Sequence, residues 1–211
     1  MDKSAINIAT YNNCAQRYQD KFMDMDLYHD TFDRFLELLS PAQTNIFEIA
    51  CGPGNIARYL LSKRADLNID GTDLASNMIE LAKVNVPEAN FSVMDCREIA
   101  SINKQYDAII CGFCLPYITD EEAEKLINDC ADLLKANGIL YVSTMEGDPA
   151  DNGLRGSASS PDKLFMHYRS ADWLTDIVKA AGFEMVDLQQ KHYSQDNGGS
   201  MTDLFVFARK S

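Results

Sequence analysis

Residues 46–57 read IFEIACGPGNIA, and this stretch decides the fold. Its first five residues are mostly apolar and predict a buried strand. Gly52 and Gly54 then permit a sharp turn with close backbone approach to a ligand, and Ile56 and Ala57 open a helical pattern. In open α/β sheets, nucleotide ligands bind where a strand passes through such a turn into a helix. The stretch therefore predicts the first strand and the ligand-binding turn of an α/β domain.

The alternation of strands and helices continues outward from this turn. Short apolar runs predict further strands at 67–71, 91–94, 106–111, 139–145, 183–188 and 204–208. Thr119 and Glu122 have capping-box spacing ahead of a helix that Gly138 is expected to end, while Ser170 begins and Gly182 ends the next helix. Upstream, apolar spacing predicts two amphipathic helices at 11–22 and 32–39. Such alternation indicates a mostly parallel sheet.

One segment interrupts this pattern. Residues 146–162 read EGDPADNGLRGSASSPD and predict a loop rich in Gly, Ser, Asp and Pro. Its position after the fifth strand favours a lid over a plain surface loop.

Composition limits the class of protein. The chain has 211 residues, 46% of them apolar, which predicts a single domain over 1–211, with a helical cap at 1–40 and a core at 41–211. It has no apolar run of membrane-spanning length and no signal-peptide pattern, so we expect a cytoplasmic protein, monomer or homodimer, with its six cysteines reduced. The net charge of −13 disfavours nucleic acid and anionic membranes as partners.

The glycine turn fits two ligand classes. Gly52, Gly54 and Ala57 match the dinucleotide fingerprint, and Asp73 follows at the distance of an NAD ribose ligand. However, Pro53 has no N–H to offer a pyrophosphate, and Glu48 would repel its charges. A sulfonium ligand with an amino group reverses the electrostatics, because Glu48 then faces a cation. Both features favour S-adenosylmethionine (SAM).

Several segments in a consistent order carry a resemblance to a known family. FEIACGPGNIA at 47–57 resembles motif I of class I SAM-dependent methyltransferases, and IDGTDLASNMIELAK at 69–83 resembles their second motif. FSVMDCREI at 91–99 and YDAIICGFCLPYI at 106–118 resemble the adenine segment and the fourth motif. YNNCAQRY at 11–18 is similar to the helix that covers SAM in small-molecule methyltransferases.

The resemblance implies a Rossmann-like seven-stranded sheet in the order 3-2-1-4-5-7-6, with strand seven antiparallel and N-terminal cap helices. SAM would lie over the carboxyl ends of the first four strands. The resemblance assigns the ribose hydroxyls to Asp73, the adenine amino group to Asp95 and Cys96, and the methionine moiety to Cys111. The residues expected to bind SAM are Tyr11, Tyr18, Glu48, Ala50, Cys51, Gly52, Gly54, Asp73, Leu74, Asp95, Cys96 and Cys111.

Some of these residues could serve the fold instead of a ligand. Asp73 could cap the following helix, although Ser76 is better placed to do so. Glu48 could pair with an arginine instead of a ligand. Cys111 and Cys114 have C-x-x-C spacing, but no second ligand pair accompanies them, so we expect no metal.

The resemblance implies methyl transfer to a small-molecule acceptor. The sequence departs from the family at Ala50, where a glycine is usual, and at Pro116-Tyr117, where a histidine pair is frequent. If a base is needed, His167 and Tyr117 are the catalytic candidates. The alternatives are an NAD(P)-dependent oxidoreductase and a non-catalytic SAM-binding regulator. The former would need a downstream Y-x-x-x-K pair, whereas Tyr59 and Lys63 lie on the helix after the glycine turn.

Overall fold

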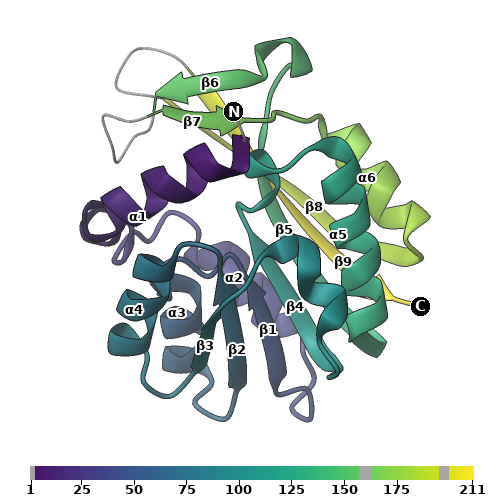
Figure 1. The fold of residues 1–211 in the computed structure, drawn as a ribbon. Helices are drawn as coiled ribbons and strands as arrows, with labels where there is room; N and C mark the ends of the chain where they lie inside the picture. Colours follow the sequence, from purple (N-terminus) through teal and green to yellow (C-terminus); the bar gives the residue numbers. More distant parts are fainter. Residues whose placement is uncertain (1–2, 157–162, 195–199) are drawn as a thin grey trace.

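The structure is a computed structural model that describes residues 3–156, 163–194 and 200–211. Seven strands form one sheet in the order β3-β2-β1-β4-β5-β9-β8 (Figure 1). All neighbours pair in parallel except β9, which runs antiparallel to both β5 and β8. Because β8 and β9 are the sixth and seventh strands of this sheet, the predicted order 3-2-1-4-5-7-6 is confirmed. The strands are β1 (Asn45–Ile49), β2 (Asn68–Asp73), β3 (Asn90–Val93), β4 (Tyr106–Gly112), β5 (Leu134–Glu146), β8 (Phe183–Ser194) and β9 (Ser200–Lys210).

Helices cover both faces of the sheet. Side chains alternate along each strand, so Phe47 and Ile49 of β1 face one apolar core while Ile46 faces the other. The first core is closed by α5 (Asp120–Leu133) and α6 (Ala171–Ala180). The second is closed by α2 (His29–Leu38), α3 (Asn55–Lys63) and α4 (Ser76–Asn85). This two-sided burial explains why the central strands read as almost unbroken apolar runs.

The helix α1 (Lys3–Phe22) lies apart from these layers, across the carboxyl ends of β1, β2 and β4 (Figure 1). It begins eight residues before the predicted start at Tyr11. Its Asn7 side chain pairs with Phe165 as a strand would: Nδ2 donates to the Phe165 carbonyl at 3.0 Å, and Oδ1 accepts from the Phe165 amide at 2.8 Å. Further along α1, Asn12 Oδ1 accepts from the Asn77 amide at 2.9 Å and so caps α4. This cap takes the place of the Ser76 cap suggested by the sequence.

The segment predicted as a loop at 146–162 contains more structure than expected. It includes a short 3₁₀ turn at Pro149–Asp151 and the strand β6 (Gly153–Gly156), which pairs with β7 (Lys163–Met166) in a separate two-stranded sheet. Residues 157–162 lie outside the described part of the chain. The β7 strand packs on α1, because Phe165 holds Asn7 and the Lys163 carbonyl accepts from Thr10 at 3.2 Å.

The helix starts predicted at Thr119 and Ser170 are confirmed, whereas the helix end predicted at Gly138 is wrong. Thr119 and Glu122 form a complete capping box, and Ser170 Oγ accepts from the Trp173 amide. Gly138, however, is part of β5, since α5 already ends at Leu133. The left-handed residue that lets the chain reverse here is Asn137, with φ 62.

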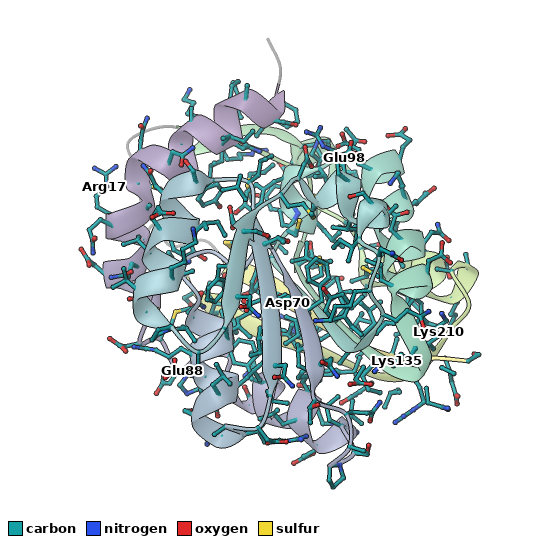
Figure 2. The ribbon with its side chains drawn as sticks, turned by 60° about the horizontal axis from the view of Figure 1, so that its bottom comes forward. Arg17, Asp70, Glu88, Glu98, Lys135 and Lys210 are labelled. Atoms are coloured by element: carbon teal, nitrogen blue, oxygen red, sulfur yellow. The ribbon has the colours of Figure 1, made fainter. Side chains whose placement is uncertain are left out.

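Two ion pairs lie toward the amino-terminal ends of the strands, and Figure 2 labels one residue of each, Asp70 and Lys135. Lys104 lies 2.5 Å from Asp70, and Lys135 lies 2.8 Å from Asp107.

No helix in the described ranges combines the length and apolar character of a membrane span.

Candidate functional site

The backbone amides of the turn after β1 are hydrogen-bonded within the protein. The Cys51 amide donates to the Thr72 carbonyl at 2.9 Å, the Gly52 amide to Asp73 Oδ2 at 3.0 Å, and the Gly54 amide to the Cys51 carbonyl at 3.0 Å. Pro53 has no amide hydrogen. The turn at 51–54 therefore presents no N–H group to a pyrophosphate.

Positive φ angles give this turn its shape. Gly54 has φ 84 and is the N-cap of α3, and a Cβ there would lie 3.2 Å from Val86. Ala50, which stands where the family usually has glycine, has φ 55. A non-glycine residue in this region is strained, which shows that the turn imposes the conformation whichever residue is present.

Asp73 ends β2 and connects it to the glycine turn. Its Oδ2 accepts from the Gly52 amide and its Oδ1 from the Ala75 amide at 2.8 Å. Burial raises the pKa of Asp73, and the Ala75 and Gly52 amides oppose that shift. These two hydrogen bonds fix the carboxylate at the cavity described next.

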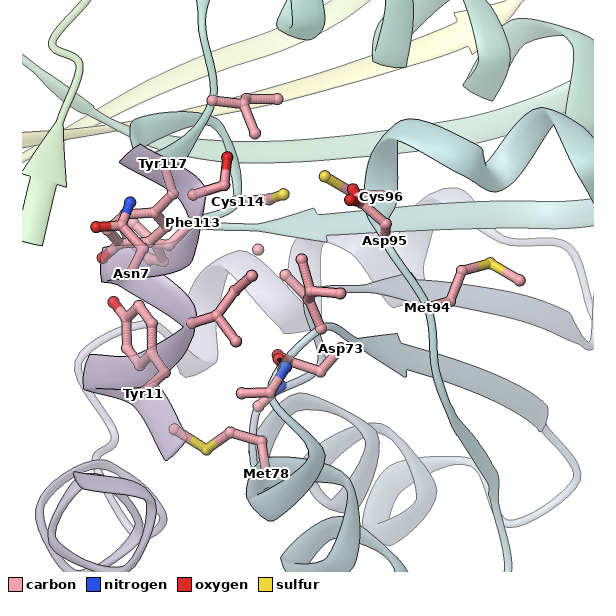
Figure 3. Close-up of a pocket in the computed structure, with 18 of the residues that line it drawn as sticks. Asn7, Tyr11, Asp73, Met78, Met94, Asp95, Cys96, Phe113, Cys114 and Tyr117 are labelled. Carbon is pink, nitrogen blue, oxygen red and sulfur yellow. Dashed lines mark hydrogen bonds between the residues drawn. The ribbon is translucent and has the colours of Figure 1, made fainter. Parts of the chain in front are cut away.

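A cavity lies between α1 and the carboxyl ends of the strands (Figure 3). Figure 3 shows Asn7 and Tyr11 on α1 facing Asp73, Asp95 and Cys96 across it. Its wall is mainly apolar, with a few polar groups at defined positions, as is usual for small-molecule sites. The lining residues are Ser4, Asn7, Ile8, Tyr11, Tyr18, Ala50, Gly52, Asp73, Leu74, Ala75, Met78, Met94, Asp95, Cys96, Arg97, Gly112, Phe113, Cys114, Tyr117 and Ile118.

Tyr11 and Tyr18 of α1 and Tyr117 of the 115–117 turn form one aromatic part of this wall. The Tyr11 ring lies edge-on to Tyr18 at a centroid distance of 6.0 Å and to Tyr117 at 5.3 Å. Burial raises the pKa of Tyr117 to about 12 and raises the pKa values of Tyr11 and Tyr18 as well. All three are therefore neutral phenols near pH 7.

Asp95 lines the cavity with its carboxylate already engaged. Arg97 Nε lies 2.9 Å from Oδ1 and 3.0 Å from Oδ2, and Nη2 lies 2.5 Å from Oδ2. Oδ1 also accepts from the Arg97 amide at 2.9 Å. Burial acts to raise the pKa of Asp95, but the hydrogen bonds from Arg97 outweigh it and lower the pKa. Arg97 extends the network to Glu122 at 3.0 Å and Ser4 at 3.2 Å.

Glu48 lies below the glycine turn and does not line the cavity. Its side chain is 1% exposed, and neither carboxyl oxygen has a hydrogen-bond partner within bonding geometry. Burial raises the pKa of Glu48 to about 8, an effect that the Ala57 amide opposes and the Asp73 charge increases. The arginine partner suggested as an alternative is not present among the described residues.

Most of the predicted site residues line the cavity, and some lie outside its wall. Cys51, Gly54 and Cys111 do not line the cavity, although Cys51 and Gly54 shape the turn. His167 also lies outside it, where its amide donates to the Pro116 carbonyl at 2.7 Å and its ring lies 5.2 Å from Phe165. The predicted residues in the wall are Tyr11, Tyr18, Ala50, Gly52, Asp73, Leu74, Asp95, Cys96 and Tyr117.

Sequence reasoning missed several wall residues. Ser4 and Ile8 precede Tyr11 at helical spacing, so extending the predicted helix upstream could have found them. Arg97 gave no comparable signal, because its role depends on Asp95 and Glu122 meeting in space.

Cys96 and Cys114 point toward one another at the cavity wall (Figure 3). A hydrogen bond to Cys114 and burial both raise the pKa of Cys96. No group of three or more His, Cys, Asp or Glu side chains placed to hold a metal ion occurs in the described ranges.

Comparisons with known proteins agree with this architecture. The model of the methyltransferase domain family matches residues 46–138. A protein of Invertebrate iridescent virus 6 that carries the name methyltransferase is 28% identical over 177 residues, which are 82% of this chain and 66% of that protein. The malonyl-acyl-carrier-protein O-methyltransferase of Acetivibrio thermocellus is 28% identical over 144 residues, which are 67% of this chain and 46% of that enzyme. The chain thus spans less than two thirds of the length of each.

A solved structure shares the whole fold. Magnesium protoporphyrin IX methyltransferase from Synechocystis PCC 6803, solved with bound S-adenosylhomocysteine (SAH), superposes with a TM-score of 0.73 at 17% identity, and the match covers 100% of both chains. The sequence matches and the shared fold support a class I SAM-dependent methyltransferase: residues 46–138 match the methyltransferase domain, and the sheet has the fold of these enzymes.

Proposed function

We propose that this chain binds SAM in the α1 cavity and transfers its methyl group to a small-molecule acceptor. The observation that carries the proposal is the bonding of the 51–54 turn, whose amides are all engaged or absent while Asp73 faces the cavity. A dinucleotide would need those amides for its pyrophosphate. A ligand with a ribose and no phosphate needs only the carboxylate.

Each part of the cavity has a role in this proposal. Asp73 would hold the ribose hydroxyls, while Tyr11 and Tyr18 would cover the ligand and exclude water. The carboxyl of Glu48, which burial keeps protonated near pH 7, would act on the ligand's amino group by losing its proton when that cation binds above it. SAM supplies an activated sulfonium methyl, so the chain has to align the acceptor and keep water out. Tyr117, as a neutral phenol, would orient the acceptor by a hydrogen bond.

Two features support a small acceptor: the net negative charge of the chain and the cover that α1 gives the cavity. The net charge of −13 opposes a nucleic acid substrate, and α1 closes one side of the cavity with Ser4, Asn7, Ile8, Tyr11 and Tyr18. A cytoplasmic location and a monomeric or dimeric state remain predictions from the sequence.

Calorimetric titration with SAH tests the cofactor assignment. Asp73→Ala should weaken SAH binding at least about tenfold, because charge-assisted hydrogen bonds contribute roughly 1.5 to 3 kcal/mol each. Asp70→Asn is the matched control, since Asp70 lies three residues earlier on the same strand, does not line the cavity and pairs with Lys104. Unchanged SAH affinity in Asp73→Ala, or tighter binding of NADH than of SAH by the wild type, would contradict the proposal.

A further inference from the structure

Two carboxylates line the cavity at neighbouring strand ends, and they differ in what holds them. Asp73 ends β2 and accepts from the Gly52 and Ala75 amides. Asp95 follows β3, the edge strand next to β2, and accepts from Arg97. The proposed function places the ribose of SAM at Asp73 and its amino group above β1. The base of the ligand then extends in the opposite direction, toward β3 and Asp95.

Asp95 keeps a free acceptor position although Arg97 contacts both of its oxygens. The Arg97 amide donates to Oδ1 at 2.9 Å, and Nη2 donates to Oδ2 at 2.5 Å. The Nε hydrogen is shared between Oδ1 at 2.9 Å and Oδ2 at 3.0 Å. These N–H groups occupy about three of the roughly four lone-pair sites that an ionised carboxylate offers. One site is therefore left for a donor on the ligand in the cavity.

Arg97 also fixes the charge and the orientation of this acceptor. Burial acts to raise the pKa of Asp95, but the hydrogen bonds from Arg97 outweigh it and lower the pKa. An ionised carboxylate only accepts hydrogen bonds, whereas a protonated carboxyl can also donate one. Without the guanidinium, Asp95 would keep only its bond to the backbone amide, and burial would raise its pKa. It could then turn, take up a proton and face a carbonyl oxygen as well as an amino group.

The guanidinium of Arg97 is itself held through its third nitrogen. Nη1 donates to Glu122 Oε1 at 3.0 Å and to Ser4 Oγ at 3.2 Å. Glu122 is fixed in turn, because its Oε2 accepts from the Thr119 amide at 2.8 Å in the capping box of α5. Hydrogen bonds to Asp95 and Glu122 raise the pKa of Arg97, so it stays charged. Arg97 is therefore directed at Asp95 and is not free to turn toward a carbonyl oxygen of the ligand.

We propose that Arg97 is a positioning residue that makes the cavity select a purine with an amino group over one with a carbonyl group at the same position. This inference rests on the proposed function and adds the residue that sets which base the cofactor carries. The amino group of adenine donates to the remaining site of Asp95. A carbonyl oxygen in that place would face an ionised carboxylate and leave the acceptor site unpaired, and both effects weaken binding.

Two product analogues that differ only in the base test the proposal. SAH carries adenine, and S-inosylhomocysteine carries hypoxanthine, in which a carbonyl oxygen replaces the amino group. In calorimetric titrations the wild type should bind SAH at least about tenfold more tightly, because a charge-assisted hydrogen bond separates the two ligands. Arg97→Met removes the guanidinium and should reduce this ratio to about threefold or less. Arg97→Lys restores the charge but not the planar fork, so it should recover part of the ratio.

Lys125→Gln is the matched control. Lys125 donates to the Arg97 carbonyl at 2.9 Å, so this change removes a nearby positive charge without touching the Asp95 carboxylate. Its affinity ratio should equal that of the wild type. 

The ratio of the two affinities distinguishes base selection from a purely structural role. Arg97→Met with weaker binding of both analogues but the wild-type ratio would overturn the inference, as would a wild-type ratio near one. If Arg97→Met does not fold, Arg97→Lys decides the question, because a ratio equal to that of the wild type would then contradict the inference. A wild type that does not bind SAH would instead refute the proposed function.

Discussion

The buried carboxyl of Glu48 should make the protein less stable as the pH rises. Its pKa is raised from an ordinary value of 4.5 to about 8, and neither oxygen has a hydrogen-bond partner. A carboxyl whose pKa is higher in the folded state stabilises the fold fully below the unfolded pKa. That contribution is lost as the pH rises, because the unfolded chain releases the proton first.

The magnitude follows from the shift. Each unit of pKa difference corresponds to about 1.4 kcal/mol, so the penalty grows by about 3 kcal/mol between pH 5 and pH 7.5. Glu48→Gln removes the titration. The difference in the free energy of unfolding between the variant and the wild type should therefore move by that amount, in favour of the variant, over this range.

Urea denaturation at pH 5, 6, 7 and 7.5 measures this difference. Comparing the two proteins at each pH removes the constant cost of burying an amide, because only the change with pH is informative. Asp107→Asn is the opposite control: Lys135 and Asn45 outweigh burial and lower the pKa of Asp107 to about 2, so no loss of stability is expected in this window. Parallel pH profiles for wild type and Glu48→Gln would refute the reasoning and would show that Glu48 is ionised and paired. SAH affinity should fall in the same variant if Glu48 acts on the ligand's amino group.

Three further outcomes are expected. Ala50→Gly should raise the free energy of unfolding by about 1 kcal/mol, because glycine relieves the positive φ at this turn; a lower thermal midpoint would contradict the assignment of strain. SAH should slow alkylation of Cys96, which lines the cavity, while buried Cys130 should stay unreactive with or without ligand; peptide mapping that shows no change at Cys96 would remove it from the site. His167→Ala should leave SAH affinity and kcat for methyl transfer unchanged, since its ring lies outside the cavity wall; a fall of kcat by about a hundredfold would identify it as a catalytic base.

The central sheet was the most predictable part of the molecule. Its strands are buried on both faces and therefore stand out as apolar runs, and local signals such as the capping box of Thr119 and Glu122 mark helix starts. The end of α5 was mispredicted because Gly138 appeared to be the obvious cap, whereas Asn137 adopts the left-handed conformation.

The part of the cavity formed by α1, together with the β6–β7 pair behind it, was less predictable because contacts between residues distant in the sequence define it. The β6 and β7 strands are short, β6 is mostly exposed, and β7 packs on α1. The pairing of Asn7 with Phe165 joins residues 158 positions apart. Asp73 was identifiable from its spacing to the glycine turn. The neutralisation of Arg97 was not, because one of its two partners, Glu122, lies on α5 and meets Arg97 only in the folded chain.

The attachment of α1 has a consequence for the kinetics of the site. Asn7 and Thr10 fasten its first half to β7, and Asn12 fastens its middle to α4. These contacts hold a single continuous helix on two sides, so they should break as one cooperative unit. A ligand held between Asp73 and Tyr11 adds its own binding free energy to that unit. The residence time of the ligand and the rate at which α1 amides exchange with solvent would then be governed by the same opening event.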